Sequence, residues 1–507
     1  MADAFELRNF TTENLYSVLQ NEWLPATDVA NNRHAKYLAG YLESPEIGAK
    51  TIVAELDYVD ADYLDDYVSY YSRCFQTYQR RCKRIHFFSH AFDVAQFRVA
   101  IHGNIGDAKL LTDSYLGFVV ARPLPDAIIG RTVLALYPPD DGRRNYPCVL
   151  EYSATLFGLH LSVRSLAFQE QDTVLAACAT VALWCCLDKT RELFPGSLSP
   201  TPAEITRAAN QVIHHARPIP SRGLIADQIC SAIRQAGLEH EVVWMNDSTP
   251  ILSLLYGHLR MGLPVILGVD IEGLGGHAIA VAGYSLLRTR HLQREIASNT
   301  KSAPMIGLRI NELYAHDDGI GPFSRLRVEP STAPGRAVHF TGTWERGGNH
   351  LPLVPKLIVV PVYHKIRVTY LDIQVWVDRL TAVLSTVVFG QGDGMEWDVH
   401  LTMTNQIKRE MKESGQLAPD ELDSFLFSSQ PRFMWCAILR WDGVPLMRLF
   451  FDATGMSRSL PLFTVLWHDT EFKVAMRAYF EMDPIRDLLI HYLTRPFFEE
   501  LRKSALA

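Results

Sequence analysis

Three short stretches in the middle of the chain carry residue types that together could perform nucleophilic chemistry. Cys178 lies near the start of a long apolar run, His277 follows a pair of glycines, and Asp317 follows a strand-like apolar run. A thiol, an imidazole that takes its proton and a carboxylate that orients the imidazole are the parts of a thiol hydrolase. We therefore expect Cys178 to be the nucleophile, His277 the general base and Asp317 the residue that orients His277.

The run from Val174 to Leu187 predicts a buried helix that begins close to Cys178. A thiol at the start of a helix lies near the positive end of the helix dipole, which favours the thiolate form. The alternative is an inert core cysteine, because free cysteines are among the most buried residues. For Cys185 and Cys186, two turns further along, we expect packing alone.

His277 opens a predicted strand that runs to Tyr284, where its ring could project into a cleft. Asp317 is the first carboxylate after a predicted strand and could accept a hydrogen bond from the imidazole ring. Asp318 is the adjacent alternative, but it lies one residue further into the turn at Gly319, where carboxylates often bond the backbone of the turn. Taken singly, each motif also has an ordinary structural explanation.

The elements that must position these residues fall in a middle segment that alternates helix and strand. Before it lies a mixed α/β segment, and after it a Gly-, Pro- and Thr-rich stretch, 331–350, marks a boundary to a part of α+β character. The sequence thus predicts three domains, at 1–150, 151–330 and 331–507. The middle segment is predicted to contain a helix that begins at 202, helices at 223–236 and 249–260 and strands at 263–269, 277–284 and 306–315.

Composition excludes several classes of protein. The chain has 507 residues with 49 basic and 56 acidic side chains, a formal net charge of −7, so nucleic acid is not an expected partner. The longest apolar run has about 14 residues against the ~20 needed to span a bilayer. The eight cysteines lack the spacing of a disulfide framework, and no signal peptide is recognisable. These features predict a cytoplasmic protein without a membrane span.

Residues 165–325 resemble the papain-like cysteine peptidase superfamily, above all its bacteriocin-processing and related bacterial peptidases. The similarity rests on a cysteine that opens the central helix, on the GHAIAVAGY strand at 276–284 and on the YAHDDGIGPF segment at 314–323. The resemblance implies an α+β fold, namely a papain-like core with an α/β N-terminal and an α+β C-terminal flanking domain. It implies a bacterial thiol protease that cleaves an amide, isopeptide or thioester bond of a protein or peptide, with no metal and no organic cofactor.

The chain departs from this family at the oxyanion hole. Relatives usually place a glutamine six residues before the cysteine, where this chain has Asp172, so Gln171 is the expected side-chain donor beside the backbone N–H of Cys178. Ala179 replaces a common glycine, and a polar insertion near 288–302 lengthens the spacing from His277 to Asp317. Two alternatives remain, an inactive papain-like scaffold or binding protein and a transglutaminase-like acyltransferase. The substrate, the oligomeric state and the roles of the flanking domains are open.

Overall fold

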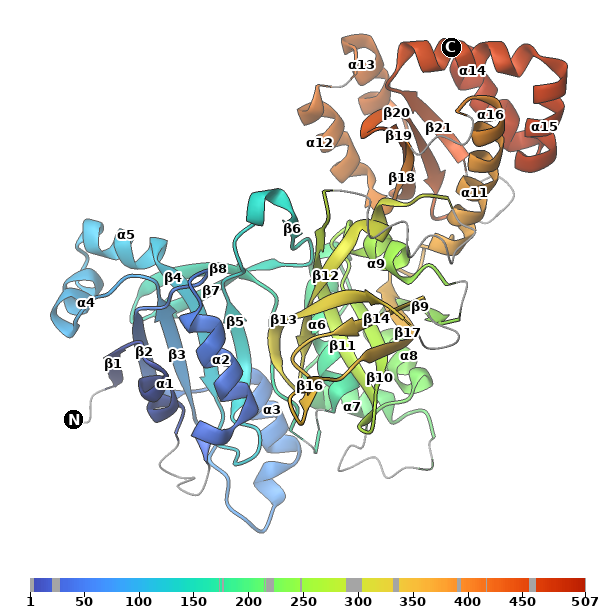
Figure 1. Ribbon diagram of the computed structural model, residues 1–507. Helices are drawn as coiled ribbons and strands as arrows, with labels where there is room; N and C mark the ends of the chain where they lie inside the picture. The colour runs from blue at the N-terminus through green and yellow to red at the C-terminus, as the bar shows by residue number, and fades with distance from the viewer. Residues whose placement is uncertain are drawn as a thin grey trace.

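The computed structural model combines helices with three main antiparallel sheets, arranged from the N-terminal unit through a central barrel to the C-terminal unit (Figure 1). Mixed helix and strand was the expected coarse class. The structure describes residues 4–20, 28–172, 174–175, 177–213, 215, 223–246, 249–288, 303–331, 337–389, 394–415, 417–455 and 462–506.

The N-terminal unit is a five-stranded sheet in chain order, β1 to β5, with every neighbouring pair antiparallel. Helix α2 (Arg33–Glu43) is the element that matters most for the site. It begins where the Asn32 side chain accepts a hydrogen bond from the backbone of Ala35, and it buries one apolar face. The strands are β1 (Phe5–Asn9), β2 (Thr51–Tyr58), β3 (Cys82–Phe88), β4 (Tyr115–Ala121) and β5 (Ile129–Leu134), and the other helices are α1 (Thr12–Leu19), α3 (Ala61–Ser69), α4 (Val94–Ile101) and α5 (Ile105–Asp113).

A hairpin of β7 (Leu150–Leu156) and β8 (Leu159–Ser165) follows, which the sequence analysis did not predict. It packs against β4 and β5, and a bridge between Thr132 and Phe168 continues this contact. The chain therefore enters the middle segment while still attached to the N-terminal sheet.

The central element is a six-stranded antiparallel barrel. It closes because β17 pairs with both β14 and β10, and β9 (Glu239–Trp244) extends it along β17. The expected domain boundary at 330 falls inside this barrel, and the Gly-rich stretch after it connects barrel strands. The barrel strands are β10 (Val265–Ile271), β11 (Gly275–Leu286), β12 (Ile310–Asp317), β13 (Gly321–Pro330), β14 (Val338–Thr341) and β17 (Leu353–Val362), with β6 (Arg144–Asn145) paired to β11 and a small β15 (Glu345–Arg346) and β16 (Asn349–His350) hairpin between β14 and β17.

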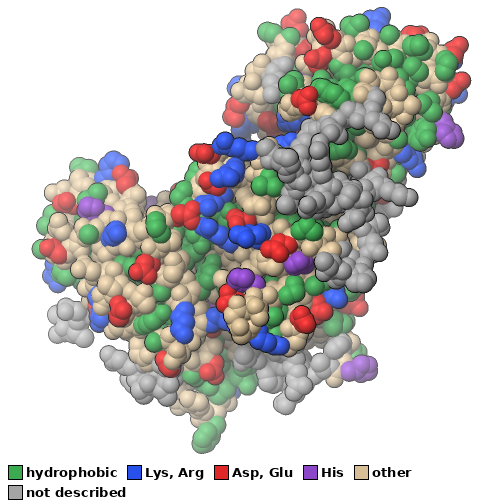
Figure 2. All heavy atoms as spheres, in the orientation of Figure 1, with side chains coloured by type: hydrophobic (Ala, Val, Ile, Leu, Met, Phe, Trp, Pro, Cys, Tyr) green, Lys and Arg blue, Asp and Glu red, His purple; other side chains and the backbone are tan. Residues whose placement is uncertain are grey.

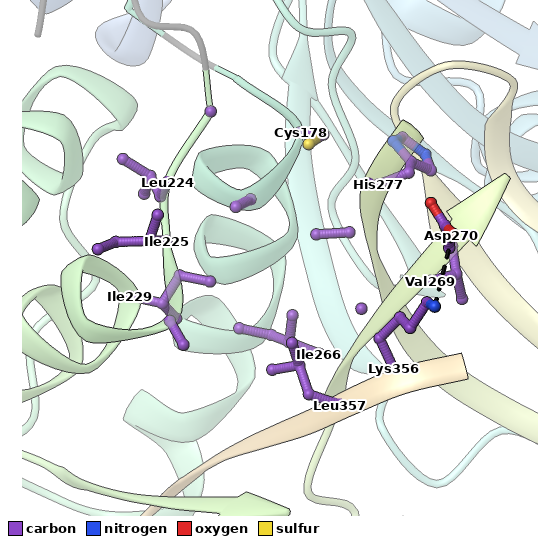
Figure 3. Close-up of a pocket in the computed structure, with 16 residues that line it drawn as sticks. Cys178, Leu224, Ile225, Ile229, Ile266, Val269, Asp270, His277, Lys356 and Leu357 are labelled. Atoms are coloured by element: carbon purple, nitrogen blue, oxygen red, sulfur yellow. Dashed lines mark ion pairs between the residues drawn. The ribbon is translucent and has the colours of Figure 1, made fainter. Parts of the chain in front are cut away.

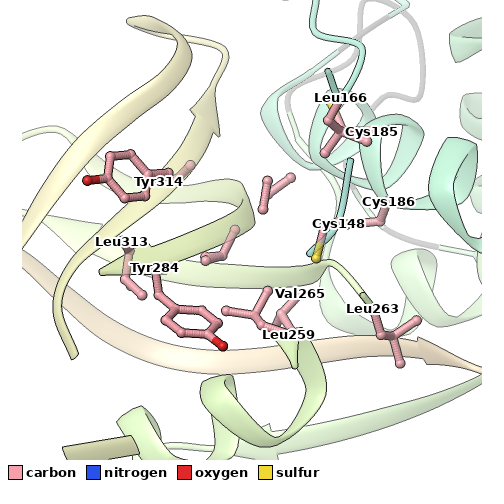
Figure 4. Close-up of a cluster of buried hydrophobic side chains, with 14 of the residues drawn as sticks. Cys148, Leu166, Cys185, Cys186, Leu259, Leu263, Val265, Tyr284, Leu313 and Tyr314 are labelled. Carbon is pink, nitrogen blue, oxygen red and sulfur yellow. The ribbon is translucent and has the colours of Figure 1, made fainter. Parts of the chain in front are cut away.

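Helix α6 (Cys178–Leu193) packs against β10, β11 and β12 of the barrel. Cys185 and Cys186 on this helix are fully buried, and Figure 4 shows them with Cys148 beside apolar barrel residues. The packing role expected for these two cysteines matches their position. The neighbouring helices are α7 (Pro202–Ala209), α8 (Ala226–Gln235) and α9 (Ile251–Leu259).

The C-terminal unit is a four-stranded antiparallel sheet, β18 to β21, with helices beside it. Its central hairpin turns at Asp442 and Gly443, both with positive φ, as a two-residue hairpin turn of type I′ requires. The elements are α11 (Tyr370–Val387), β18 (Met395–Met403), α12 (Thr404–Ser414), α13 (Pro419–Phe427), β19 (Phe433–Trp441), β20 (Val444–Asp452), β21 (Leu462–Trp467), α14 (Thr470–Glu481), α15 (Asp483–Leu493) and α16 (Arg495–Leu506).

Acidic and basic side chains are interspersed over the face drawn in Figure 2. Among the described residues, no helix has both the length and the apolar character to cross a membrane.

Candidate active site

Three adjacent elements present the predicted triad. Cys178 is the first residue of α6, His277 lies at the start of β11 and Asp317 is the last residue of β12. Strands β11 and β12 are paired, and α6 packs against both. Residues that are far apart in the sequence therefore meet at one end of the barrel.

The start of α6 offers backbone donors beside the thiol. Its N-cap residue, Ala177, provides no side-chain hydrogen bond to the first turn. The nearest capping carboxylate, Asp172, is used one turn earlier, where it accepts from the backbone N–H groups of Val174 and Leu175 and from the Tyr71 hydroxyl at 2.9 Å. Unsatisfied N–H groups at a helix start attract negative charge, so this end of α6 suits both a thiolate and an oxyanion.

His277 connects the thiol to the carboxylate. Its Nε2 lies 2.8 Å from Asp317 Oδ1, which leaves Nδ1 as the ring nitrogen available to Cys178. Burial alone would lower the pKa of His277, but the charge and hydrogen bond of Asp317, a hydrogen bond with the Cys178 side chain and the charge of Asp318 hold it well above its ordinary value. The surroundings thus favour the imidazolium form beside the sulfur.

Asp317 is held as an ionised acceptor although it is fully buried. Trp344 Nε1 donates to Oδ2 at 2.7 Å, and the backbone N–H of Gly319 donates to Oδ1 at 3.0 Å. Burial alone would raise the pKa of Asp317, but His277 and these two donors lower it below its ordinary value. The Trp344 ring also meets the His277 ring edge-on, with centroids 5.3 Å apart.

Replacing Trp344 by phenylalanine should weaken this arrangement while keeping most of the ring contact. The substitution removes the donor to Asp317 Oδ2, so the carboxylate is held less firmly and stabilises the imidazolium less. We expect the rate of Cys178 alkylation by iodoacetamide at pH 6.5 to fall about three- to tenfold, the scale of one ordinary hydrogen bond, because the lost donor acts on the sulfur only through Asp317 and His277. A rate equal to that of the wild type would show that Trp344 does not support the carboxylate.

The Asp318 carboxylate is buried beside the same ring but is not hydrogen-bonded to it. Neither carboxylate oxygen has a hydrogen-bond partner among the described residues, and Oδ1 lies 3.7 Å from His277 Nε2. Burial raises the pKa of Asp318 to about 7, partly opposed by the charge of His277. The geometry therefore makes Asp317 the hydrogen-bond partner of His277.

His277, Asp317 and Asp318 lie close enough to hold a metal ion, with ligand atoms within 4.8 Å of one another. The direct hydrogen bond between His277 and Asp317 accounts for the arrangement of these two residues.

A pocket of about 360 Å³ extends from Cys178 and His277 along the barrel (Figure 3). Its wall is mainly apolar, and an ion pair between Lys356 Nζ and Asp270 Oδ2, 3.5 Å apart, lies at its side. The apolar side chains come from α8 and the segment before it and from β10, β11 and β17: Leu224, Ile225, Ile229, Ile266, Val269, Ala278 and Leu357. The pocket can therefore hold an apolar group next to the sulfur.

The structure does not place Gln171 in this pocket. Gln171 is partly buried in the segment before α6, outside the pocket lining. Gln169 is buried, and its Nε2 has no hydrogen-bond partner among the described residues, but it also lies outside the lining. The predicted insertion near 288–302 lies outside the described residues from 289 onward.

Sequence reasoning missed the residues that hold the triad in place. Trp344 lies in the stretch interpreted as a domain boundary, and nothing in its sequence neighbourhood points to Asp317. His316 was quoted only as part of a motif. Its Nε2 donates to Leu166 O at 2.9 Å and its Nδ1 accepts from Phe323 N at 3.1 Å, and burial lowers its pKa to about 4, so it fixes the end of β12 as a neutral ring.

No protein-family model matches the chain, and no curated protein is detectably similar to it in sequence.

Proposed function

We propose that the protein is a cysteine hydrolase of papain-like type that cleaves an amide, isopeptide or thioester bond in a protein or peptide. The observation that carries this proposal is the position of His277, which is hydrogen-bonded to the buried Asp317 carboxylate and lines the same pocket as the Cys178 side chain. A thiol, an imidazole and an orienting carboxylate in this order are what acyl transfer through a thioester requires.

In the proposed mechanism the Cys178 thiolate attacks the substrate carbonyl carbon and forms a C–S bond. The backbone N–H of Cys178 would stabilise the oxyanion, whereas Gln171, which lies outside the pocket lining, is given no part in this step. The His277 imidazolium then donates its proton to the leaving amine or thiol as the scissile bond breaks. A water molecule, deprotonated by His277, attacks the thioester and releases the acid and the Cys178 thiol.

The pocket supports a preference for apolar acyl groups. Burial of apolar surface contributes about 25 cal/mol for each Å² removed from water, so the side chains along this wall favour an apolar substrate residue close to the scissile carbonyl. The ion pair of Lys356 with Asp270 gives the pocket a polar side as well.

An acyl-type, cysteine-reactive probe tests the proposal on the full chain. We expect stoichiometric labelling of the wild-type protein at Cys178, located by peptide mass spectrometry, and no labelling at that position in Cys178→Ala. Cys74 and Cys230, which are also partly buried, serve as internal controls for general thiol reactivity. Labelling of Cys178 no faster than that of these two cysteines contradicts the proposal and favours an inactive scaffold.

Adding amine donors separates hydrolysis from acyl transfer to amines. With any substrate found through the probe, we expect water to be the acceptor, so that the free acid remains the main product at millimolar amine. A predominantly amidated product, formed in the wild type but not in Cys178→Ala, would instead establish a transglutaminase-like acyltransferase.

A further inference from the structure

A buried histidine of the N-terminal unit contacts the segment that leads into α6 and the turn that follows β12. His34 lies in α2, about 280 residues before Asp318 in the sequence, yet its Nε2 lies 2.7 Å from the backbone oxygen of Asp318. Its Nδ1 lies 2.7 Å from Oε1 of Glu170, in the segment that leads into α6. One imidazole ring therefore joins the segment before the nucleophile to the turn after the orienting carboxylate.

Glu170 is itself fixed to the N-terminal sheet. Its Oε2 accepts from the backbone N–H of Ile129 at 3.0 Å, its own N–H donates to Ile129 O at 3.0 Å, and its carbonyl accepts from Arg122 Nη2 at 2.9 Å. The anchor that His34 uses is thus rigid, and a shift of α2 would be transmitted to the turn at Asp318.

Two further residues of α2 hold the same turn. Arg33 donates to Gly319 O at 3.2 Å and its guanidinium lies over the Trp344 ring, 4.7 Å from the centroid. The Tyr37 hydroxyl donates to Pro322 O at 2.8 Å. Its ring also packs so closely on Gly321 that a Cβ there would overlap it. Helix α2 therefore contacts the turn after β12 from its first residue onward.

We propose that His34 is a positioning residue for the triad, so that the N-terminal unit is part of the catalytic centre rather than a separate flanking domain. The inference rests on the proposed function of Cys178, His277 and Asp317. His34 touches none of the reacting atoms and acts through the backbone that follows Asp317.

The contacts of the two ring nitrogens favour the charged form of His34. Nδ1 faces a carboxyl oxygen of Glu170 and Nε2 faces a backbone carbonyl oxygen, and an imidazolium can donate to both at once. Burial alone would lower the pKa of His34, but its contacts with Glu170 and Asp318 raise it above its ordinary value. The charged groups that face the ring are Glu170 and Asp318. Arg122 is hydrogen-bonded to the segment that contains Glu170, and Arg33 to the turn that contains Asp318.

The test measures alkylation of Cys178 by iodoacetamide in the full chain between pH 5 and pH 10, with one rate constant per cysteine obtained by mass spectrometry. In His34→Ala we expect the alkylation rate constant of Cys178 in the acidic part of this pH range to fall about tenfold, the scale expected when a catalytic group is slightly misplaced. The rate of Cys230 should not change. His34→Gln, whose amide can donate to one of the two acceptors, should recover part of the loss.

His86→Gln is the matched control. His86 is also fully buried in the N-terminal unit, but its hydrogen bonds, to the Tyr115 hydroxyl and Glu55, stay within that unit. We expect the Cys178 profile of His86→Gln to equal that of the wild type. A purely structural role for His34 would instead lower the melting temperature of both variants and leave both Cys178 profiles unchanged.

A folded His34→Ala protein with a wild-type Cys178 profile overturns the inference. If His34→Ala does not fold, the exposed Arg33 replaces it in the test: Arg33→Gln should lower the same rate constant about threefold, and no change overturns the inference equally. His277→Ala separates this failure from that of the proposed function. If wild type and His277→Ala give the same Cys178 alkylation rates, the proposed triad is contradicted. If His277→Ala changes these rates but the α2 variants do not, only the positioning role of His34 is contradicted.

Discussion

Cys178 in the His277→Ala protein should react with iodoacetamide about a hundredfold more slowly at pH 6.5 than in the wild type. The surroundings hold the pKa of His277 well above its ordinary value and so favour the imidazolium, whose positive charge stabilises a thiolate beside it. Loss of this positive charge removes a main support of the thiolate, which is the reactive form, and a factor of about a hundred is the lower end of what an acid–base group contributes.

The direction of the pH dependence provides the check. The advantage of the wild type should be largest at acidic and neutral pH and should shrink towards alkaline pH, where His277 loses the proton that gives it its charge. Alkylation rates of Cys178 at each pH, with Cys230 as the internal reference, measure this. If the pH profiles of Cys178 alkylation in the wild type and in His277→Ala coincide, His277 does not activate the thiol and the proposed catalysis is contradicted.

Loss of the Asp317 carboxylate should have the next largest effect. Asp317→Ala leaves the donors of His277, Trp344 and Gly319 without their acceptor in a fully buried site, and we expect kcat/KM to fall by about a hundredfold or more. Asp317→Asn keeps an oxygen for His277 and should retain measurable turnover. Asp318→Ala should lose little, since no described group is hydrogen-bonded to that carboxylate.

A double variant sharpens this prediction. In Asp317→Asn the amide that directs its oxygen to His277 must direct its NH₂ group towards Trp344 Nε1, so two donors face each other. Adding Trp344→Phe removes that conflict and should restore part of the activity of Asp317→Asn, but none of that of Asp317→Ala. The measurement is kcat/KM on a substrate found with the probe. If kcat/KM falls strongly in Asp318→Ala and stays nearly normal in Asp317→Ala, Asp318 and not Asp317 is the residue that orients His277.

Local patterns were sufficient to predict the elements that carry the triad. The apolar run after Cys178, the strand from His277 and the strand ending near Asp317 each depend on neighbours in the sequence, and each forms close to the expected residues. Periodicity and turn residues contain this information because helices and strands are defined by short-range spacing.

Contacts between distant segments were not predictable in the same way. Trp344 lies 27 residues after Asp317 and His34 lies 284 residues before Asp318, and neither is marked by spacing or by a motif. The boundary expected after residue 330 illustrates the same limit. Gly and Pro signal a turn equally well between domains and between two strands of one barrel, and only the pairing of β17 with β10 distinguishes the two cases.

Closure of the barrel by β17 determines when the site can assemble during synthesis on the ribosome. All three triad residues emerge before Leu353, but β10 gains its second neighbour only when β17 has been made, about 90 residues later in the chain. Until then β10 and β14 present open edges that can pair with other chains. Cys178 is thus exposed to a period of incomplete strand pairing, and the barrel that positions the site is closed only after Val359 has paired with Ile266.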